Sequence, residues 1–206
     1  MPFSTCTHLG DTLKAQRVTL QSQAFVVPAP MAVSDYLRQE MDFVQQWVGV
    51  ALSEFAICEN LIYPILKEVW KQFPEFKIWS HEPLKFDEDL SGTPDYFLAR
   101  RSPYGTPVIE EPYLLVVEAK KDDFEWGWAQ CLAAMVAAQK LNRWPEQVMY
   151  GITTTGRSWQ FGKLEGARLT LDPRSFDWLP LEDVCAAVNF MFEQCRQQLK
   201  AYAGAA

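Results

Sequence analysis

Glu118 and Lys120 interrupt the most apolar stretch of the chain, YLLVVEAKK at residues 113–121. Because side chains alternate across a strand, these two residues would share one face, about 7 Å apart along it. Burying a carboxylate or an ammonium without a partner costs several kcal/mol. The pair therefore predicts either an ion pair at the end of a buried strand or a site that binds a metal ion.

Asp95 follows Pro94 in a second expected strand, TPDYFLAR at residues 93–100. Proline removes a donor from the ladder of hydrogen bonds, which suits the start of a strand. If this strand pairs with residues 113–121, Asp95 and Glu118 converge on one point. Two carboxylates suit a hard cation such as Mg²⁺ or Mn²⁺, with water completing its shell. The alternative is that Asp95 belongs only to a turn.

Glu59 is the third candidate, because it lies in line with the apolar residues of a predicted helix. The spacings of three and four residues in that seam are typical of a buried helical face. A Glu on a packed face is uncommon unless it pairs or approaches a metal ion. Alternatively, the helix bends at Pro64 and turns Glu59 outward. The seam consists of Val48, Leu52, Phe55, Glu59, Ile62, Leu66 and Val69.

The order and setting of these residues resemble the signature of the PD-(D/E)XK, or restriction-endonuclease-like, nuclease superfamily. Pro94-Asp95 matches its P-D, and Glu118-Ala119-Lys120 matches its E-x-K at the end of an apolar strand. Members of that superfamily commonly carry a Glu on the preceding helix, where Glu59 stands. Many also have a Gln on the following helix, where Gln130 stands.

The resemblance covers roughly residues 50–165 and includes GITTTGRSWQFGKL at 151–164, which is similar to a hairpin in several restriction-like members. One departure is the 23-residue step from Asp95 to Glu118. We attribute this step to a loop at residues 100–112, RRSPYGTPVIEEP, inserted between two paired strands. Such a loop is either a DNA contact or tolerated variation.

The resemblance implies a catalytic set and a metal site. Asp95, Glu118 and the main-chain carbonyl of Ala119 would hold Mg²⁺ or Mn²⁺, and Glu59 would bind a second ion or a coordinated water. Lys120 would orient or help to deprotonate the attacking water and offset charge on the phosphate. Gln130 would position the phosphate or the DNA strand, with a plain packing amide as the alternative. The catalytic set is Asp95, Glu118, Lys120, Glu59 and Gln130.

The implied partner is DNA, and the metal ion is the only cofactor expected, without a small-molecule cofactor. Many restriction-like enzymes pair subunits to cut both strands, so a homodimer is also expected. Its contact would use the C-terminal helix, where Val184, Val188 and Met191 lie on one face and Phe190 and Phe192 elsewhere. Alternatively, this helix lies under the N-terminal arm.

The elements that must position these residues follow the order helix, three strands, helix, strands. This order predicts an α/β fold with a mixed central sheet flanked by helices. Residues 1–33 are interpreted as an N-terminal arm with one short strand, and residues 34–206 as a single domain. Ser34 would cap a long helix from Asp35 to Gln72, broken or kinked at Pro64. The other predicted elements are strands at 76–83, 93–100, 113–121, 147–155 and 158–166 and helices at 125–141 and 181–202.

Composition fits one globular domain that carries an acidic charge. The 206 residues are 49% hydrophobic, the formal net charge is -7 and the sequence pI is about 4.9. That charge argues against a broad basic surface that coats nucleic acid, so any DNA contact must come from local clusters. The candidate clusters are Arg100-Arg101, Lys120-Lys121 and Arg157 with Lys163.

The five cysteines show no CxxC spacing, and neither His8 nor His81 stands at a ligand-like spacing from a cysteine. Reduced thiols in a cytoplasmic protein are therefore expected, rather than disulfides or zinc. No stretch approaches the roughly 18 apolar residues of a membrane span, so no membrane association is expected.

Three classes of function fit these observations. A metal-dependent DNA endonuclease is favoured by the intact set of Asp95, Glu118 and Lys120. A catalytically silent module that keeps the nuclease fold and binds nucleic acid or protein is favoured by the acidic charge. A purely structural domain of another fold is the third. The discriminating observation is whether Asp95 and Glu118 lie within about 8 Å, close enough to share one ion.

Overall fold

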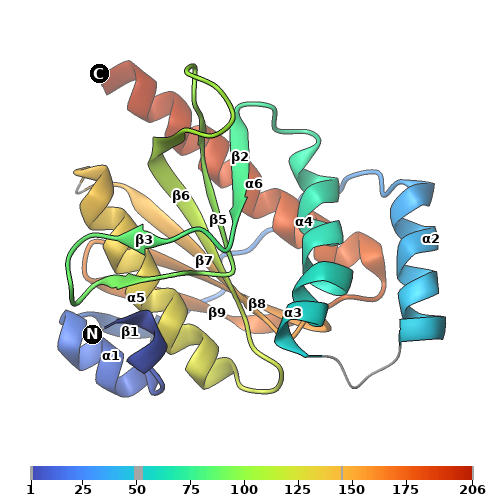
Figure 1. Cartoon of the computed structure of the whole chain (residues 1–206), viewed down its shortest axis with the longest axis horizontal. Coiled ribbons are helices and arrows are strands. Elements are labelled where there is room, and N and C mark those ends of the chain that lie inside the picture. The colour runs from blue at the N-terminus through green and yellow to red at the C-terminus, as the bar shows by residue number, and fades with distance from the viewer. Residues whose placement is uncertain (1, 49–52, 145, 206) are drawn as a thin grey trace.

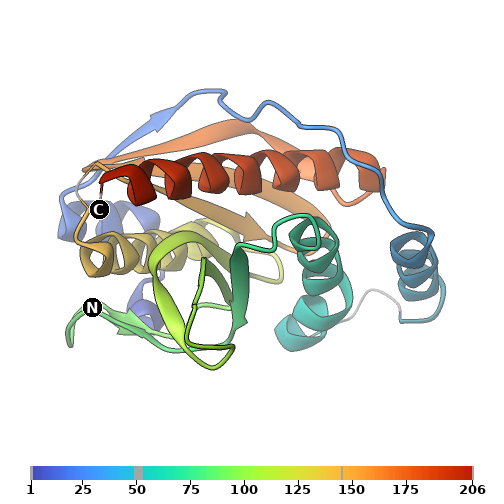
Figure 2. The same cartoon turned by 90° about the horizontal axis from the view of Figure 1, so that it is seen from above.

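The computed structural model describes residues 2–48, 53–144 and 146–205. A mixed seven-stranded sheet forms its centre, with helices on both faces (Figures 1 and 2). This arrangement confirms the predicted α/β fold with a mixed central sheet. In spatial order the strands are β1 (Thr19–Ser22), β9 (Arg168–Asp177), β8 (Ser158–Glu165), β7 (Val148–Thr154), β6 (Ile109–Ala119), β5 (Tyr96–Arg101) and β2 (Phe76–Ser80).

Strand β6 lies inside the sheet, antiparallel to β5 and parallel to β7. Its side chains enter two separate apolar clusters, because alternate residues point to opposite faces. Val116 packs in the cluster that contains α5 (Phe124–Asn142). Leu115 and Val117 pack in the cluster that contains α4 (Tyr63–Trp70) and α6 (Leu181–Ala205). The prediction of a central strand buried on both faces is confirmed.

Strands β5 and β6 extend into residues 100–112, so the loop predicted there is shorter than expected and comprises residues 102–108. Arg100 pairs with Glu110 in the strand register, so both strands continue into this region. Their side chains also form an ion pair at 2.6 Å. Bulges on either side of Ala99 absorb the extra residues of β6. The long step from Asp95 to Glu118 therefore comes from the length of the two strands together with the loop at 102–108.

The helical region after Ser34 consists of two runs, so the buried face of the second run does not continue that of the first. Ser34 caps α2 (Asp35–Phe43) through the N–H of Leu37, as predicted. The helix passes into a π turn, η2 (Val44–Val48), and a new helix then begins at Glu54 with Ser53 as its cap. The predicted seam residue Leu52 lies outside the described residues. The second helical run comprises α3 (Glu54–Ile57), η3 (Cys58–Ile62, a π turn) and α4.

Pro64 does not end this second run. It occupies the first turn of α4, directly after the π turn of η3. The residues before it are also helical, so Pro64 stands inside a continuous run, with the irregular turn of η3 directly before it. A new helix starts instead after Ser53, whose backbone is extended, so the prediction of a break at Pro64 is wrong.

Residues 1–33 contribute more than the one short strand predicted. They form η1 (Phe3–Thr5), α1 (Leu9–Gln16) and β1, which pairs in parallel with β9. Helix α1 packs against α5, beside a small antiparallel pair, β3 (Leu84–Lys85) with β4 (Ser91–Gly92). Strand β9 was not predicted.

Helix α6 is covered by its own chain. The segment after β1 runs along its outer side (Figure 2), where Ala29 bonds to the main chain of Ala186 and to the side chain of Asn189. Val184, Val188, Met191 and Phe192 are buried against the sheet and α4. The apolar faces that motivated the homodimer prediction are thus satisfied within one chain. No described helix is long and apolar enough to cross a membrane.

Candidate active site

Asp95 and Glu118 meet where β5 begins and β6 ends. The antiparallel register pairs Tyr96 with Val117, and one further step places Asp95 opposite Glu118. Asp95 Oδ2 accepts the main-chain N–H of Ala119 at 2.7 Å, which fixes this carboxylate against the end of β6. The two acidic side chains therefore face each other across neighbouring strands.

Glu118 is almost fully buried, with 3% of its surface exposed. Burial raises the pKa of Glu118 well above its ordinary value, and the Asp95 carboxylate raises it further as a charge and as a hydrogen-bond partner. Lys120 acts in the opposite direction. Two carboxylates in contact at a buried point form a site where a cation is favoured.

Lys120 completes this group from just beyond β6. Its main-chain N–H bonds to Thr154 at the end of β7. Its Nζ donates to Glu54 Oε1 at 2.6 Å and to the Ala119 carbonyl at 2.8 Å. The ammonium also lies 5.5 Å from the centre of the Trp126 ring. Lys120 is buried, whereas Glu54 is 42% exposed, so solvent reaches this ion pair from the Glu54 side.

Glu54 occupies the position that was assigned to Glu59. The inward face of the second helical run carries Ile57, Cys58 and Leu61, and Glu54 precedes the first two by three and four residues. Glu59 is exposed, so its predicted place on a packed face is wrong. The physical reason is the π turn of η3, which shifts the helix phase: Ile62 at its end is buried as predicted, whereas Phe55 before it is exposed like Glu59.

Gln130 is half-buried on α5, and its side chain makes no hydrogen bond with the described residues. It lies one turn after Trp126, the residue whose ring faces Lys120. Helix α5 approaches the sheet closely here, since a Cβ at Gly127 would come within 2.2 Å of Thr153 and 3.4 Å of Lys120. The structure therefore places Gln130 on the helix beside the site without a defined contact.

Cys58 and His81 lie on the other side of Asp95 and were not predicted as site residues. His81 Nε2 is 3.4 Å from Asp95 Oδ1. Burial, and next the Asp95 charge, raise the pKa of the Cys58 thiol to about 12. Spacing along the chain gave no signal for this group, because Cys58 is on a helix and His81 follows β2.

The oxygen donors fit the Mg²⁺ or Mn²⁺ that the sequence predicts. Asp95 and Glu118 supply two carboxylates at one point, and hard divalent ions prefer oxygen ligands of this kind. The Ala119 carbonyl faces Lys120 Nζ in this structure. As a metal ligand, that carbonyl would have to share its lone pairs with the ammonium.

Three of the six basic residues expected to contact DNA are engaged in ion pairs. Arg101, Lys121 and Arg157 are exposed. Lys121 follows Lys120, and Arg157 is in the β7–β8 turn, which packs against η3 through Gly156 and Leu61. Both thus flank the sheet end that carries the acidic pair. The ion pairs are Arg100–Glu110, Lys120–Glu54 and Lys163–Glu165.

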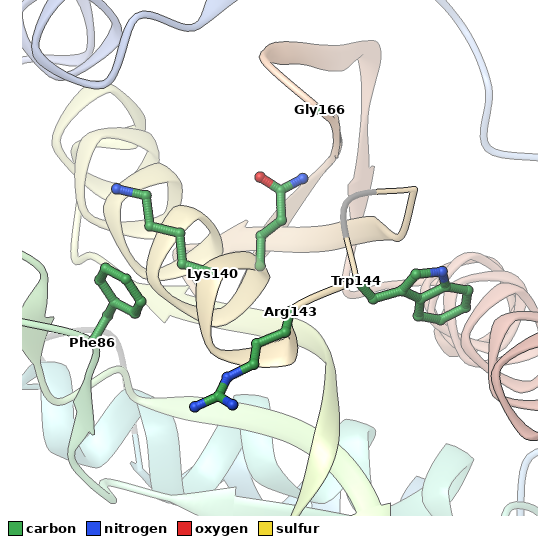
Figure 3. Close-up of a pocket in the computed structure, with 6 residues that line it drawn as sticks. Phe86, Lys140, Arg143, Trp144 and Gly166 are labelled. Atoms are coloured by element: carbon green, nitrogen blue, oxygen red, sulfur yellow. The ribbon is translucent and has the colours of Figure 1, made fainter. Parts of the chain in front are cut away.

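A hollow at the other end of α5 lies away from this site. Its volume is about 510 Å³, and Figure 3 shows Lys140 and Phe86 on one side of it and Arg143 and Trp144 on the other. It opens at the C-terminal end of α5, about 20 Å along the helix from the turn beside Lys120. This hollow therefore takes no part in the acidic site.

Comparisons with known proteins add little to this description. No family model matches the sequence, and no curated protein matches it. Among solved structures, the type IIG restriction endonuclease BpuSI aligns with a TM-score of 0.38 and 14% identity. The alignment covers 73% of this chain and 16% of that protein. Because this similarity is too low to assign function, the assignment rests on the site residues.

Proposed function

We propose that this protein is a metal-dependent nuclease of the PD-(D/E)XK type that acts on DNA. The observation that supports it is the meeting of Asp95, Glu118 and Lys120 at the start of β5 and the end of β6. These are the three residues on which the sequence resemblance depends. A seven-stranded mixed sheet holds them on strand ends, where positions are more rigid than on loops.

In this proposal Asp95 and Glu118 hold Mg²⁺ or Mn²⁺, with the Ala119 carbonyl as a third oxygen. The ion supplies electrostatic stabilisation of the phosphate and a nucleophile at neutral pH. Lys120 orients the attacking water and offsets negative charge that develops on the phosphate. Glu54, rather than Glu59, is the helix carboxylate of the site, and it positions the Lys120 ammonium.

Exposed Lys121 and Arg157 supply phosphate contacts on either side of the site. The chain as a whole is acidic, so these local charges must offset its repulsion of DNA. Gln130 remains a candidate for positioning the substrate strand, since its helix starts beside Lys120.

Cleavage of supercoiled plasmid in Mg²⁺ or Mn²⁺ tests the proposal. Lys120→Met and Asp95→Ala should each reduce the initial rate by at least about a hundredfold. Glu59→Gln is the matched control and should cleave at the wild-type rate. Cleavage that continues in excess chelator, or that survives Lys120→Met unchanged, would contradict the proposed mechanism. A single-stranded RNA substrate tested in parallel shows whether DNA is preferred.

A catalytically silent module that binds nucleic acid or protein is the second candidate. The hydrogen bond from Lys120 to the Ala119 carbonyl favours it, because the ammonium occupies an oxygen that the metal would use. The two candidates differ in thermal melts with millimolar Mg²⁺ or Mn²⁺. A nuclease should be stabilised by an ion that binds its folded state, whereas a silent module that has lost the metal site should not.

A further inference from the structure

Three different ligand types converge on one point beside the acidic site. Cys58 comes from η3, His81 directly follows β2, and Asp95 directly precedes β5. The Cys58 sulfur, a His81 ring nitrogen and an Asp95 carboxylate oxygen all lie within 4.8 Å of one another. Because the three residues come from separate elements, it is the tertiary fold that brings them together.

His81 is held with one ring nitrogen directed at this point. Its main chain has a φ of 53°, which is uncommon for a residue with a side chain, and its N–H bonds to the Asp95 carbonyl at 2.9 Å. Ser80 Oγ lies 2.9 Å from Nδ1, which leaves Nε2 facing Asp95. The ring also contacts Phe55 and Tyr96, with centroids 5.7 Å away in both cases.

The two carboxylate oxygens of Asp95 contact different neighbours. One oxygen accepts the Ala119 N–H on the Glu118 side, and the other faces His81. Cys58 is 1% exposed, and its thiol adjoins the Asp95 carboxylate and the Tyr96 hydroxyl. Both Cys58 and Asp95 are thus fixed by the fold rather than free to turn away.

A plain explanation is a His81–Asp95 ion pair beside a core thiol. An ion pair accounts for two of the residues, but it does not explain why the Cys58 sulfur faces the same point. Sulfur, imidazole nitrogen and carboxylate oxygen together are the ligands preferred by zinc-like ions, whereas Mg²⁺ takes oxygen alone. The His81 side chain is 36% exposed, so an ion could enter from its side.

We propose that Cys58, His81 and Asp95 bind a divalent transition-metal ion of the zinc and cobalt type. Ligand atoms around such an ion lie about 3.5 Å apart, and His81 Nε2 and Asp95 Oδ1 already stand at 3.4 Å. Three protein ligands leave a fourth position open toward the exposed edge of His81. Ser80 is a positioning residue, because its hydroxyl fixes the ring.

This site does not depend on the nuclease proposal, although Asp95 belongs to both. If both are occupied, Asp95 bridges the zinc-like ion and the hard cation beside Glu118. Thiolate ligation distinguishes the two ions, since only the zinc-like ion would contact sulfur.

Titration of the chelator-treated full chain with Co²⁺ provides the test. A cobalt–thiolate site gives a charge-transfer absorption in the near ultraviolet, and we expect this band to saturate at one ion per chain. Zn²⁺ should displace it, and excess Mg²⁺ should not. Cys58→Ser should abolish the band, whereas Cys185→Ser, which changes a buried thiol in the α4–α6 core, should retain it.

His81→Ala provides a second variant that does not disturb the core, because this side chain is partly exposed. It should weaken Co²⁺ binding by more than about a hundredfold, and Ser80→Ala should weaken it about tenfold to a hundredfold. Glu118→Gln should retain the band even if it abolishes cleavage, which separates this site from the nuclease proposal. Absence of the band in the wild type, or its persistence in Cys58→Ser, overturns the inference.

Discussion

Asp95 accepts the main-chain N–H of Ala119 at 2.7 Å, and this hydrogen bond joins the start of β5 to the end of β6. Because Glu118 immediately precedes Ala119, the same contact holds the two carboxylates against each other. The second Asp95 oxygen faces His81 at 3.4 Å. A single aspartate therefore connects an oxygen-rich site to one that contains sulfur and nitrogen.

The Glu54–Lys120 pair should contribute modestly to stability. Glu54→Gln removes the charge partner of a buried ammonium, but Glu54 is 42% exposed, so solvent screens the pair. We expect a loss of about 1 kcal/mol in the free energy of unfolding, measured by urea denaturation. Glu59→Gln, one turn further along and exposed, should change stability by less than about 0.5 kcal/mol. Equal effects of the two substitutions would contradict the assignment of Glu54 to the site.

Asp172 should make stability depend on pH in the acid range. Burial by itself would raise the pKa of this carboxyl, but Arg174 and the N–H groups of Phe25 and Val26 outweigh burial and hold the pKa below its usual range. A carboxyl with a depressed folded-state pKa stabilises the protein above its unfolded pKa of about 4. That stabilisation is lost as pH falls toward the folded pKa.

Asp172→Asn should therefore destabilise the protein at about pH 7 by roughly 2–3 kcal/mol and flatten the decline below about pH 4. Asp177→Asn, an exposed position at the end of the same strand, is the control. Urea denaturation across this pH range measures both. An acid-range slope that Asp172→Asn leaves unchanged would mean that other groups cause it.

Gly127→Ala should separate α5 from the sheet beside Lys120. The added Cβ would lie 2.2 Å from Thr153 Cγ2, and this β-branched side chain is buried and cannot turn away. We expect a loss of about 1–3 kcal/mol by chemical denaturation. Gly10→Ala places the same methyl group on α1, with nothing within 4 Å. That control should stabilise by about 0.5–1 kcal/mol, and a loss of similar size in both would indicate a helix effect rather than a clash.

Lys121 and Arg157 should carry much of the electrostatic attraction for DNA. We expect Lys121→Ala with Arg157→Ala to weaken binding of a catalytically inactive Lys120→Met chain. Each lost contact should lower the slope of log K against log salt by about 1. Arg168→Ala, exposed at the other end of β8 and β9, should leave that slope unchanged. Fluorescence anisotropy with a short duplex at several salt concentrations measures the slope, and an unchanged slope in the double variant would place the DNA contact elsewhere.

The sequence predicted those features that depend on local pattern. The apolar run before Glu118 predicted a buried central strand, and the alternation along it placed the E-x-K residues at its end. Pro94 correctly indicated that Asp95 stands at the start of a strand. Strand β9 was missed because RLTLDPRSFD mixes apolar residues with charges and a proline and therefore resembles a turn. Its parallel pairing with β1 joins residues about 150 positions apart, which no local pattern reveals.

The helical side of the site could not be derived in the same way. Glu54 and Cys58 depend on the helix phase, which restarts at Ser53 and shifts again at the π turn of η3, whereas His81 follows β2. A single seam with regular α-helical spacing, drawn from Val48 to Val69, selected Glu59, five residues beyond Glu54. Ser53 followed by Glu54 is a local N-cap signal, and starting a new helix there would have directed Glu54 and Cys58 inward.

The initial rate of plasmid cleavage by Glu118→Gln tests the central claim most directly, because Glu118 belongs to the proposed hard-cation site and not to the cluster of Cys58 and His81. Loss of several kcal/mol of electrostatic stabilisation corresponds to a decrease of about a thousandfold in Mg²⁺ or Mn²⁺. Glu111→Gln, which neutralises an exposed carboxylate near the start of β6, should keep the wild-type rate. The account predicts this difference between the two variants, and equal cleavage by both would contradict it.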